Sequence, residues 1–221
     1  MSIALIDYDA GNLTSVRKAL THLGARFETP AGPAALAGAR AVIVPGVGNF
    51  EVTAALDADW RRALAGVLER GGLLLGICVG LQWLFEGSEE APGVPGFGAL
   101  PGRCRLIEHP DPAGPADGAL FKVPHVGWNS LHRKRDSWVL DGVAEGDQVY
   151  FTHSYAAPVG ADCICSTTHG IEFASVVERE RLVGMQFHPE KSGDVGLRLF
   201  RNVLDRMAAS TQRPDAPRSV R

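Results

Sequence analysis

The fold is decided by one stretch, Gly72-Leu-Leu-Leu-Gly-Ile-Cys78-Val-Gly-Leu-Gln82, in which an apolar run ends at a cysteine between two glycines. Residues 73–77 are apolar enough for a strand that is buried on both faces, and the segment with the apolar residues Leu81, Trp83, Leu84 and Phe85 continues as a helix. Gly76 and Gly80 allow a sharp turn of the backbone between them. Gly-x-Cys-x-Gly is the thiol counterpart of the Gly-x-Ser-x-Gly elbow, which exposes a nucleophile and aims the following N–H groups at the substrate. The alternative is a buried cysteine with a structural role.

Strand and helix patterns alternate before this stretch. Strand patterns cover residues 3–7, 26–29 and 41–44, and helical spacing covers residues 13–23, with Asn12 as the predicted cap, and residues 60–68. Such alternation favours right-handed crossovers and a mostly parallel sheet. Four later runs look antiparallel, followed by a strand and a closing helix: 138–140, 149–155, 163–168 and 173–177, then 182–187 and 199–207. The predicted fold is α/β and three-layered, with a mostly parallel central sheet, helices on both faces and additional antiparallel strands.

Length and composition favour one globular unit. The chain has 221 residues, of which 45% are hydrophobic and 21% charged, enough for one full core. We expect a single domain over residues 1–207. After residue 207 the chain becomes polar, and we expect residues 208–221 to form a mobile tail.

Charge and cysteine usage limit the environment and the partners. A formal net charge of -3 gives no reason to expect nucleic acid or an anionic membrane, so partners should be small molecules or proteins. No apolar run approaches the roughly 20 residues of a membrane span, and the charge of Asp7 interrupts the first apolar run. Four cysteines without a C-x-x-C pair suit a reducing, cytoplasmic compartment. Cys163 and Cys165 are expected to pack in a strand, and neither a metal nor a cofactor is expected.

A candidate base follows the last predicted strand, in His188-Pro-Glu190. Pro189 pushes the residue before it toward an extended conformation, in which residues two apart point the same way. Glu190 can then orient His188 toward a nucleophile supplied from elsewhere. Cys78, His188 and Glu190 would form a triad of nucleophile, base and orienting carboxylate. Alone, the motif is also typical of a polar turn. The other histidines, His22, His109, His132 and His169 among them, are interpreted as surface groups.

The glycine-rich loop Pro45-Gly-Val-Gly48 also follows a predicted strand. Glycine on both sides of Val47 frees the peptide plane to rotate. The N–H groups of Val47 and Val79 could together hold the negative oxygen of a tetrahedral intermediate. The loop is not a phosphate loop, because no Gly-x-x-x-x-Gly-Lys-Ser/Thr sequence is present.

With these motifs the chain resembles the class I (triad) glutamine amidotransferases, through the cysteine elbow and the His-Pro-Glu motif. Within that class it is most similar to the branch of glutaminase subunits of imidazole glycerol phosphate synthase. The closer resemblance rests on Asp7-Tyr-Asp-Ala-Gly-Asn-Leu13, Pro45-Gly-Val-Gly-Asn-Phe50, Lys122-Val-Pro-His-Val-Gly-Trp-Asn129, Tyr150-Phe-Thr-His-Ser-Tyr155 and Gln186-Phe-His-Pro-Glu-Lys191. Two positions depart mildly from the pattern: Asp9 stands where Gly is frequent and Val79 where Leu is usual.

The resemblance implies that glutamine is hydrolysed and that its ammonia passes to a barrel-shaped cyclase subunit in a heterodimer, for histidine biosynthesis. It implies that Gln82 and Glu90 meet the α-amino group of glutamine. Further substrate contacts are implied for Gly46, Gly48, His153, Ser154 and Tyr155. The partner interface is implied at Asn12, His125, Gly127, Trp128, Asn129 and Lys191. Because free ammonia wastes glutamine, the Val47 N–H is expected to point away from the site until the partner and its ligand are engaged.

Three other functions remain open at this stage. The first is an amidotransferase with the same triad and another acceptor, against which Leu81 argues mildly because His commonly precedes Gln in those branches. The second is a non-catalytic scaffold of the same fold, which would have no use for an intact triad. The third is a standalone cysteine hydrolase, which would lack an apolar docking face.

Overall fold

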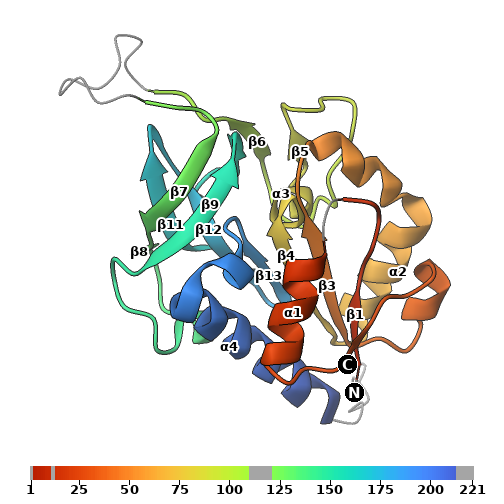
Figure 1. Ribbon diagram of the computed structural model, residues 1–221. Helices are drawn as coiled ribbons and strands as arrows, with labels where there is room; N and C mark the ends of the chain where they lie inside the picture. The colour runs from red at the N-terminus through yellow and green to blue at the C-terminus, as the bar shows by residue number, and fades with distance from the viewer. Residues whose placement is uncertain (1, 11–12, 110–120, 213–221) are drawn as a thin grey trace, which may run out of the picture.

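An eight-stranded mixed sheet forms the centre of the molecule, in the order β2-β1-β3-β4-β13-β12-β11-β8 (Figure 1). Its strands are β1 (Ile3–Leu5), β2 (Phe27–Glu28), β3 (Ala41–Gly46), β4 (Leu73–Cys78), β8 (His132–Arg133), β11 (Cys163–His169), β12 (Ile171–Arg179) and β13 (Leu182–Met185). The computed structural model describes residues 2–10, 13–109 and 121–212. Strands β2, β1, β3, β4 and β13 are parallel, and the next three are antiparallel, which confirms the predicted fold class.

The centre of the parallel half is fully covered. All six residues of β3 and all six of β4 are buried, as expected for strands that have a layer on each face. The chain moves from β1 to β2 in one direction across the sheet and from β3 to β4 in the other. Because such crossovers are right-handed, α1 and α2 lie on opposite faces. This gives the three layers.

Four α-helices cover the sheet: α1 (Thr14–His22), α2 (Ala58–Glu69), α3 (Val79–Leu84) and α4 (Gly193–Gln212). Figure 1 shows α1 and α4 in front of the sheet and α3 behind it. The side chain of Asp57 caps α2 by accepting from the N–H groups of Asp59 and Trp60. Helix α4 continues to Gln212, past the boundary at residue 207, and Asn12 lies outside the described residues. No helix among the described residues is long and apolar enough to cross a membrane.

Two smaller sheets flank the large one. One pairs β7 (His125–Ser130) with β9 (Gln148–His153), and the other joins β10 (Tyr155–Ala156), β6 (Arg103–Leu106) and β5 (Gly87–Ser88). The β7–β9 pair lies in front of β11 and β12 in Figure 1. Residues 122–129 include turn-forming residues such as Pro124 and Gly127. The segment nevertheless contains most of strand β7, because β9 provides a partner for all six residues of β7.

One predicted strand is wrong. Residues Trp138–Leu140 form a 3₁₀ helix, η3, instead of a strand. The Ser137 side chain accepts from the Val139 N–H at 3.0 Å, and such a local bond favours a turn over a ladder. Three further 3₁₀ helices are η1 (Pro33–Leu36), η2 (Phe50–Ala55) and η4 (Pro189–Lys191).

Candidate active site

Cys78 stands at the end of β4, where the chain turns into α3. Its φ is 55° and its ψ is -111°, a conformation that L-residues rarely adopt. Gly76 and Gly80 pack backbone against backbone: a Cβ on Gly76 would lie 2.5 Å from the Gly80 carbonyl oxygen, and a Cβ on Gly80 would overlap the carbonyl oxygen of Val44. The two glycines therefore allow the strained turn, which has the geometry of a nucleophile elbow.

His188 and Glu190 reach this elbow from the neighbouring strand. β13 pairs with β4 in parallel, with Met185 opposite Ile77, so the segment after β13 emerges beside Cys78. His188 Nδ1 lies 2.8 Å from Glu190 Oε1, and the two side chains are 2% and 3% exposed. The expectation that residues 188–190 are all extended is wrong. His188 is extended, but Pro189 starts the 3₁₀ helix η4, because its fixed φ suits the first position of a helix.

The charges of this group support one another. Burial lowers the pKa of His188, but the charges of Cys78 and Glu190 and the hydrogen bond to Glu190 outweigh burial and raise it to about 10. Nδ1 is bonded to Glu190, so Nε2 is the ring nitrogen left for Cys78. Among the described residues, Nε2 has no hydrogen-bond partner. An imidazolium beside a sulfur stabilises the thiolate, the reactive form.

Gln186 is a residue of this site that the sequence did not single out. Its Nε2 lies 3.9 Å from Cys78 Sγ, and its Oε1 accepts from Gln82 Nε2 at 3.3 Å. Gln82 Nε2 also donates to the Tyr155 carbonyl oxygen at 2.8 Å. The buried Oε1 of Gln82 has no partner among the described residues. The only signal in the sequence is position, two residues before His188 at the end of the strand expected over residues 182–187, where alternate residues share a face.

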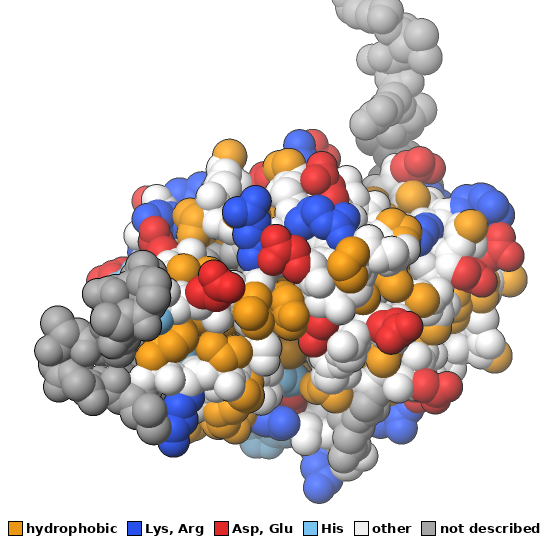
Figure 2. Space-filling view, turned by 90° about the horizontal axis from the view of Figure 1, so that it is seen from above, with side chains coloured by type: hydrophobic (Ala, Val, Ile, Leu, Met, Phe, Trp, Pro, Cys, Tyr) orange, Lys and Arg blue, Asp and Glu red, His pale blue; other side chains and the backbone are white. Residues whose placement is uncertain are grey.

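A pocket of about 270 Å³ opens beside Cys78. Its lining residues are Gly48, Cys78, Val79, Gln82, Glu90, Pro124, Thr152, His153, Ser154 and Tyr155. Seen from the carboxyl ends of the parallel strands, the surface is hollowed near its middle (Figure 2). Most predicted substrate residues therefore meet in one place. Gly46 does not line the pocket, but it pairs with Cys78 in the sheet. A larger hollow of about 510 Å³ at the amino end of β1 contains none of the motif residues.

The two predicted oxyanion donors, the N–H groups of Val79 and Val47, point in different directions. Val79 begins α3 directly after Cys78, so its N–H belongs to the first turn of that helix. The Val47 N–H instead donates to the Ala10 carbonyl oxygen at 3.0 Å. Ala10 follows β1, and β4 is on the other side of β3. In this structure the Val47 N–H therefore points away from Cys78, as expected for the free chain.

Three histidines cluster next to the pocket, with His125 stacked on His169 and edge-to-face with His153. The ring centroids of His125 and His169 are 4.1 Å apart, and His125 Nδ1 lies 3.2 Å from His153 Nε2. Burial, followed by the neighbouring imidazoles, lowers the pKa of His125 to about 3. Burial also lowers the pKa of His153 to about 4, against the effect of its hydrogen bond to the Tyr155 carbonyl. The interpretation of His169 as a surface group is wrong, because it is half-buried in this stack.

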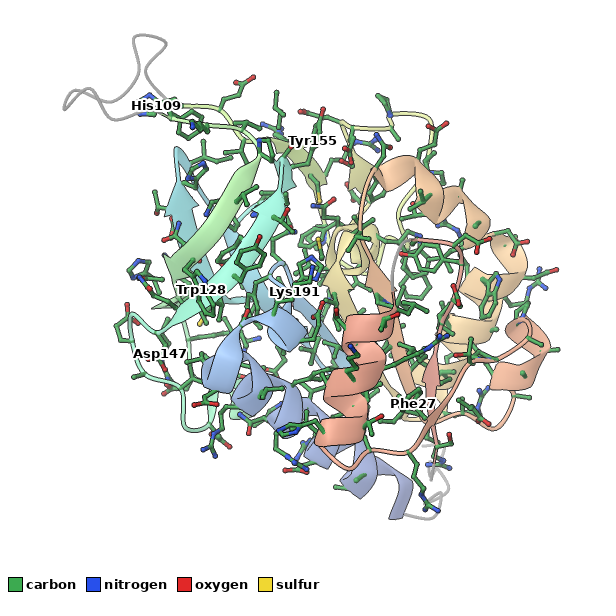
Figure 3. The ribbon with its side chains drawn as sticks, viewed as in Figure 1. Phe27, His109, Trp128, Asp147, Tyr155 and Lys191 are labelled. Carbon is green, nitrogen blue, oxygen red and sulfur yellow. The ribbon has the colours of Figure 1, made fainter. Side chains whose placement is uncertain are left out.

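The predicted interface residues divide into exposed and buried ones. Trp128 is 53% exposed and Lys191 is exposed, while His125 is only 4% exposed. A Cβ on Gly193, two residues after Lys191, would touch the Trp128 ring at 3.8 Å. The segment around Lys191 and the exposed side of β7 that carries Trp128 are therefore next to each other (Figure 3). Asn129 bonds inward, to His125 and to the Thr168 carbonyl, and Gly127 has a positive φ of 140°.

No group of three or more His, Cys, Asp or Glu side chains with metal-binding geometry occurs in residues 2–10, 13–109 and 121–212.

Comparisons with known proteins agree with this geometry. The family model described as glutamine amidotransferase class-I matches residues 4–207. The imidazole glycerol phosphate synthase subunit HisH of Desulfovibrio desulfuricans is 44% identical over 213 residues, which cover 95% of this chain and 97% of that protein. The protein of the same name from Methanothermobacter thermautotrophicus is 41% identical over 204 residues, covering 92% and 98%.

Solved structures share the fold at low sequence identity. A crystal structure of a glutamine amidotransferase has a TM-score of 0.69 and 19% identity, covering 94% of this chain and 100% of that chain. The glutaminase domain of Trypanosoma brucei CTPS with bound acivicin has a TM-score of 0.64 and 18% identity, covering 98% and 96%. The chain belongs to the class-I glutamine amidotransferase family.

Proposed function

We propose that this chain is the glutaminase subunit of an imidazole glycerol phosphate synthase, acting in histidine biosynthesis in the cytoplasm. Relatives with that name are 41–44% identical, as described above, over more than nine-tenths of both chains. The observation that carries the chemistry is that Cys78, which lines a pocket of about 270 Å³, stands next to the segment that holds the His188–Glu190 pair. A scaffold without turnover would have no need of this arrangement.

The triad supplies each step of glutamine hydrolysis. The Cys78 thiolate attacks the side-chain amide carbon, and a tetrahedral oxyanion forms. The His188 imidazolium gives its proton to the departing nitrogen, so that ammonia leaves and a thioester remains. His188 then takes a proton from water, which attacks the thioester and releases glutamate and the thiolate. Glu190 holds Nδ1 of His188 at 2.8 Å and so directs Nε2 at the sulfur.

The pocket has partners for both ends of glutamine. The buried Oε1 of Gln82 lacks a partner among the described residues and can accept from the α-amino group. Glu90 accepts from the Phe50 N–H at 2.8 Å through Oε2, which leaves Oε1 to pair with the same ammonium group. The backbone of His153, Ser154 and Tyr155 lies on the pocket wall, where it can bind the α-carboxylate.

The partner in this proposal is a cyclase subunit that receives the ammonia. The side chains of Val126 and Trp128 on β7 are 57% and 53% exposed, an apolar pair suited to a protein interface. Trp128 contacts the Tyr150 ring, with centroids 6.2 Å apart, and the Tyr150 carbonyl accepts from the His188 N–H at 3.1 Å. The proposed interface is thus two contacts away from the catalytic base. Lys191 and Asn129 complete it, and Asn12 lies outside the described residues.

Ammonia release tests the proposal. The purified chain alone should release little ammonia from glutamine, because the Val47 N–H is bonded to Ala10 and one oxyanion donor is missing. Adding the cyclase subunit together with its ribonucleotide should raise turnover by about 10²-fold or more, the usual effect of one oxyanion donor. The Cys78→Ala variant should bind the partner and release none. Full activity of the lone chain, or no response to the cyclase, would contradict the proposal.

A further inference from the structure

The hydroxyl of Tyr8 is buried without a hydrogen-bond partner among the residues that the structure describes. Tyr8 is 7% exposed and follows β1, in the same loop as Ala10. Burial, and after it the charge of Cys78, raise the pKa of this hydroxyl above its ordinary range, so it stays a protonated donor. A buried polar group without a partner is unfavourable, and its presence needs a physical reason.

The unpartnered hydroxyl lies against the oxyanion loop. A Cβ built on Gly46 would be 2.5 Å from the Tyr8 hydroxyl oxygen, 3.0 Å from the Val79 Cβ and 3.2 Å from the Gly80 nitrogen. Tyr8 therefore fills the space that the missing side chain of Gly46 leaves open. This places its donor beside the peptide that joins Gly46 to Val47.

The orientation of that peptide follows from its planarity. In a trans peptide the carbonyl and the N–H point in opposite directions and rotate together. The Val47 N–H points to Ala10, on the β1 side of β3, so the Gly46 carbonyl points to the β4 side, where Cys78 lies. Turning the N–H toward Cys78 brings the carbonyl of Gly46 to the β1 side of β3, toward the loop after β1 that contains Tyr8 and Ala10. There it would meet the Ala10 carbonyl oxygen, which repels it, unless a donor is present.

We infer that Tyr8 is a positioning residue for the oxyanion hole, whose hydroxyl donates to the Gly46 carbonyl once the Gly46–Val47 peptide has turned its N–H toward Cys78. The hydroxyl then gains a partner only in the active arrangement, which explains why it has none in the resting one. This inference rests on the proposed function, because the turned peptide is needed only for the tetrahedral intermediate. The competing role is a direct effect of the hydroxyl on the Cys78 sulfur.

The test compares Tyr8→Phe, which removes only the hydroxyl, with Ser166→Ala. Ser166 is a fully buried control whose hydroxyl has a partner, Glu172 Oε1 at 2.7 Å. Each variant is assayed for glutaminase kcat and KM in complex with the cyclase subunit and its ribonucleotide. The melting temperature and the pH profile of Cys78 alkylation by iodoacetamide are measured on the same proteins.

We expect Tyr8→Phe to lower the activated kcat about three- to tenfold, the effect of one hydrogen bond, at unchanged KM. Its alkylation profile should match that of the wild type, and its melting temperature should be no lower, because the hydroxyl has no partner to lose in the resting state. Ser166→Ala should melt earlier at unchanged kcat. A shifted alkylation profile in Tyr8→Phe would overturn the inference in favour of a direct effect on the sulfur. An unchanged kcat would overturn it while the proposed function stands. An inactive wild-type complex would overturn both.

Discussion

The backbone N–H of Val47 donates to the carbonyl oxygen of Ala10 at 3.0 Å, on the side of β3 that faces away from Cys78. The bond joins the loop after β1 to the loop after β3, and it turns the proposed oxyanion donor away from Cys78. The side chains of the proposed triad, in contrast, are already next to one another. Under the proposed function, activation therefore requires the rotation of one peptide plane and no assembly of catalytic side chains.

A methyl group on Gly48 tests the freedom of that peptide. Gly48 has a φ of 93°, and a Cβ there would meet nothing within 4 Å, so Gly48→Ala changes backbone strain without a clash. We expect a loss of stability of roughly 1–2 kcal/mol and a lower activated turnover. Gly160→Ala is the matched control, because its Cβ is also unobstructed and no positive φ is present. Equal melting temperatures and turnover for the two variants would contradict this account.

Removing either partner of His188 should change how its imidazole titrates. The charge of Cys78, and then the hydrogen bond and charge of Glu190, raise the pKa of His188 to about 10 against the effect of burial. In Cys78→Ala and in Glu190→Gln the pKa of His188 should therefore fall, as read from its ring resonances by NMR. Glu190→Gln should also lower kcat by roughly 10²- to 10⁴-fold, because the ring loses its orientation.

The control for this titration is Glu145→Gln. Glu145 Oε1 lies 2.9 Å from His132 Nδ1 on the surface, so the change removes a carboxylate from a different histidine. The His188 resonances should titrate as in the wild type. A His188 pKa that stays near 10 in Cys78→Ala would mean that the sulfur does not face this ring.

Glu90 should affect substrate binding more than chemistry. Its carboxylate accepts from the Phe50 N–H and lines the pocket, so Glu90→Gln should raise KM for glutamine about tenfold with a smaller effect on kcat. Glu89→Gln removes the neighbouring carboxylate, which forms only an exposed ion pair with Arg105 at 3.7 Å. That variant should keep the wild-type KM. A similar KM for both variants would remove Glu90 from the proposed recognition of the α-amino group.

Stability should fall in acid because two histidines are buried in the neutral form. The pKa of His125 is lowered to about 3 and that of His153 to about 4, both chiefly by burial, from an ordinary value of 6.5. Between these values and pH 6.5 the unfolded chain binds more protons, so the free energy of unfolding decreases as the pH falls. The slope is about 1.4 kcal/mol per pH unit for each proton taken up.

Urea unfolding at pH 7, 6 and 5 measures this slope. In His125→Gln, where the side chain no longer titrates, the decrease between pH 7 and pH 5 should be smaller than in the wild type, whatever the stability at pH 7. An unchanged decrease would mean that these histidines do not account for acid lability.

The sequence was sufficient to predict features that depend on local geometry. Gly76 and Gly80 around Cys78 predict the elbow, and Pro189 predicts the extended conformation of His188, although Pro189 itself starts a 3₁₀ helix and does not continue an extended run. Features that depend on distant partners were not predictable. The 122–129 region has turn residues and becomes a strand only because β9 pairs with it. Tyr8 and Gln186 lie in conspicuous sequence blocks, but nothing local gives them a role, and His169 lies in no such block. Their roles arise from neighbours far along the chain.

The pairing of β4 with β13 has a consequence for inactivation by heat. Cys78 ends β4 and His188 follows β13, and these two strands are neighbours in the middle of the eight-stranded sheet, whereas the edges are the two-residue strands β2 and β8. Fraying begins at such edges and reaches central strands last. Warming should therefore leave Cys78 and His188 together until the whole domain melts. Glutaminase activity should therefore be lost at the melting temperature of the fold, and no folded but inactive state should be populated below that temperature.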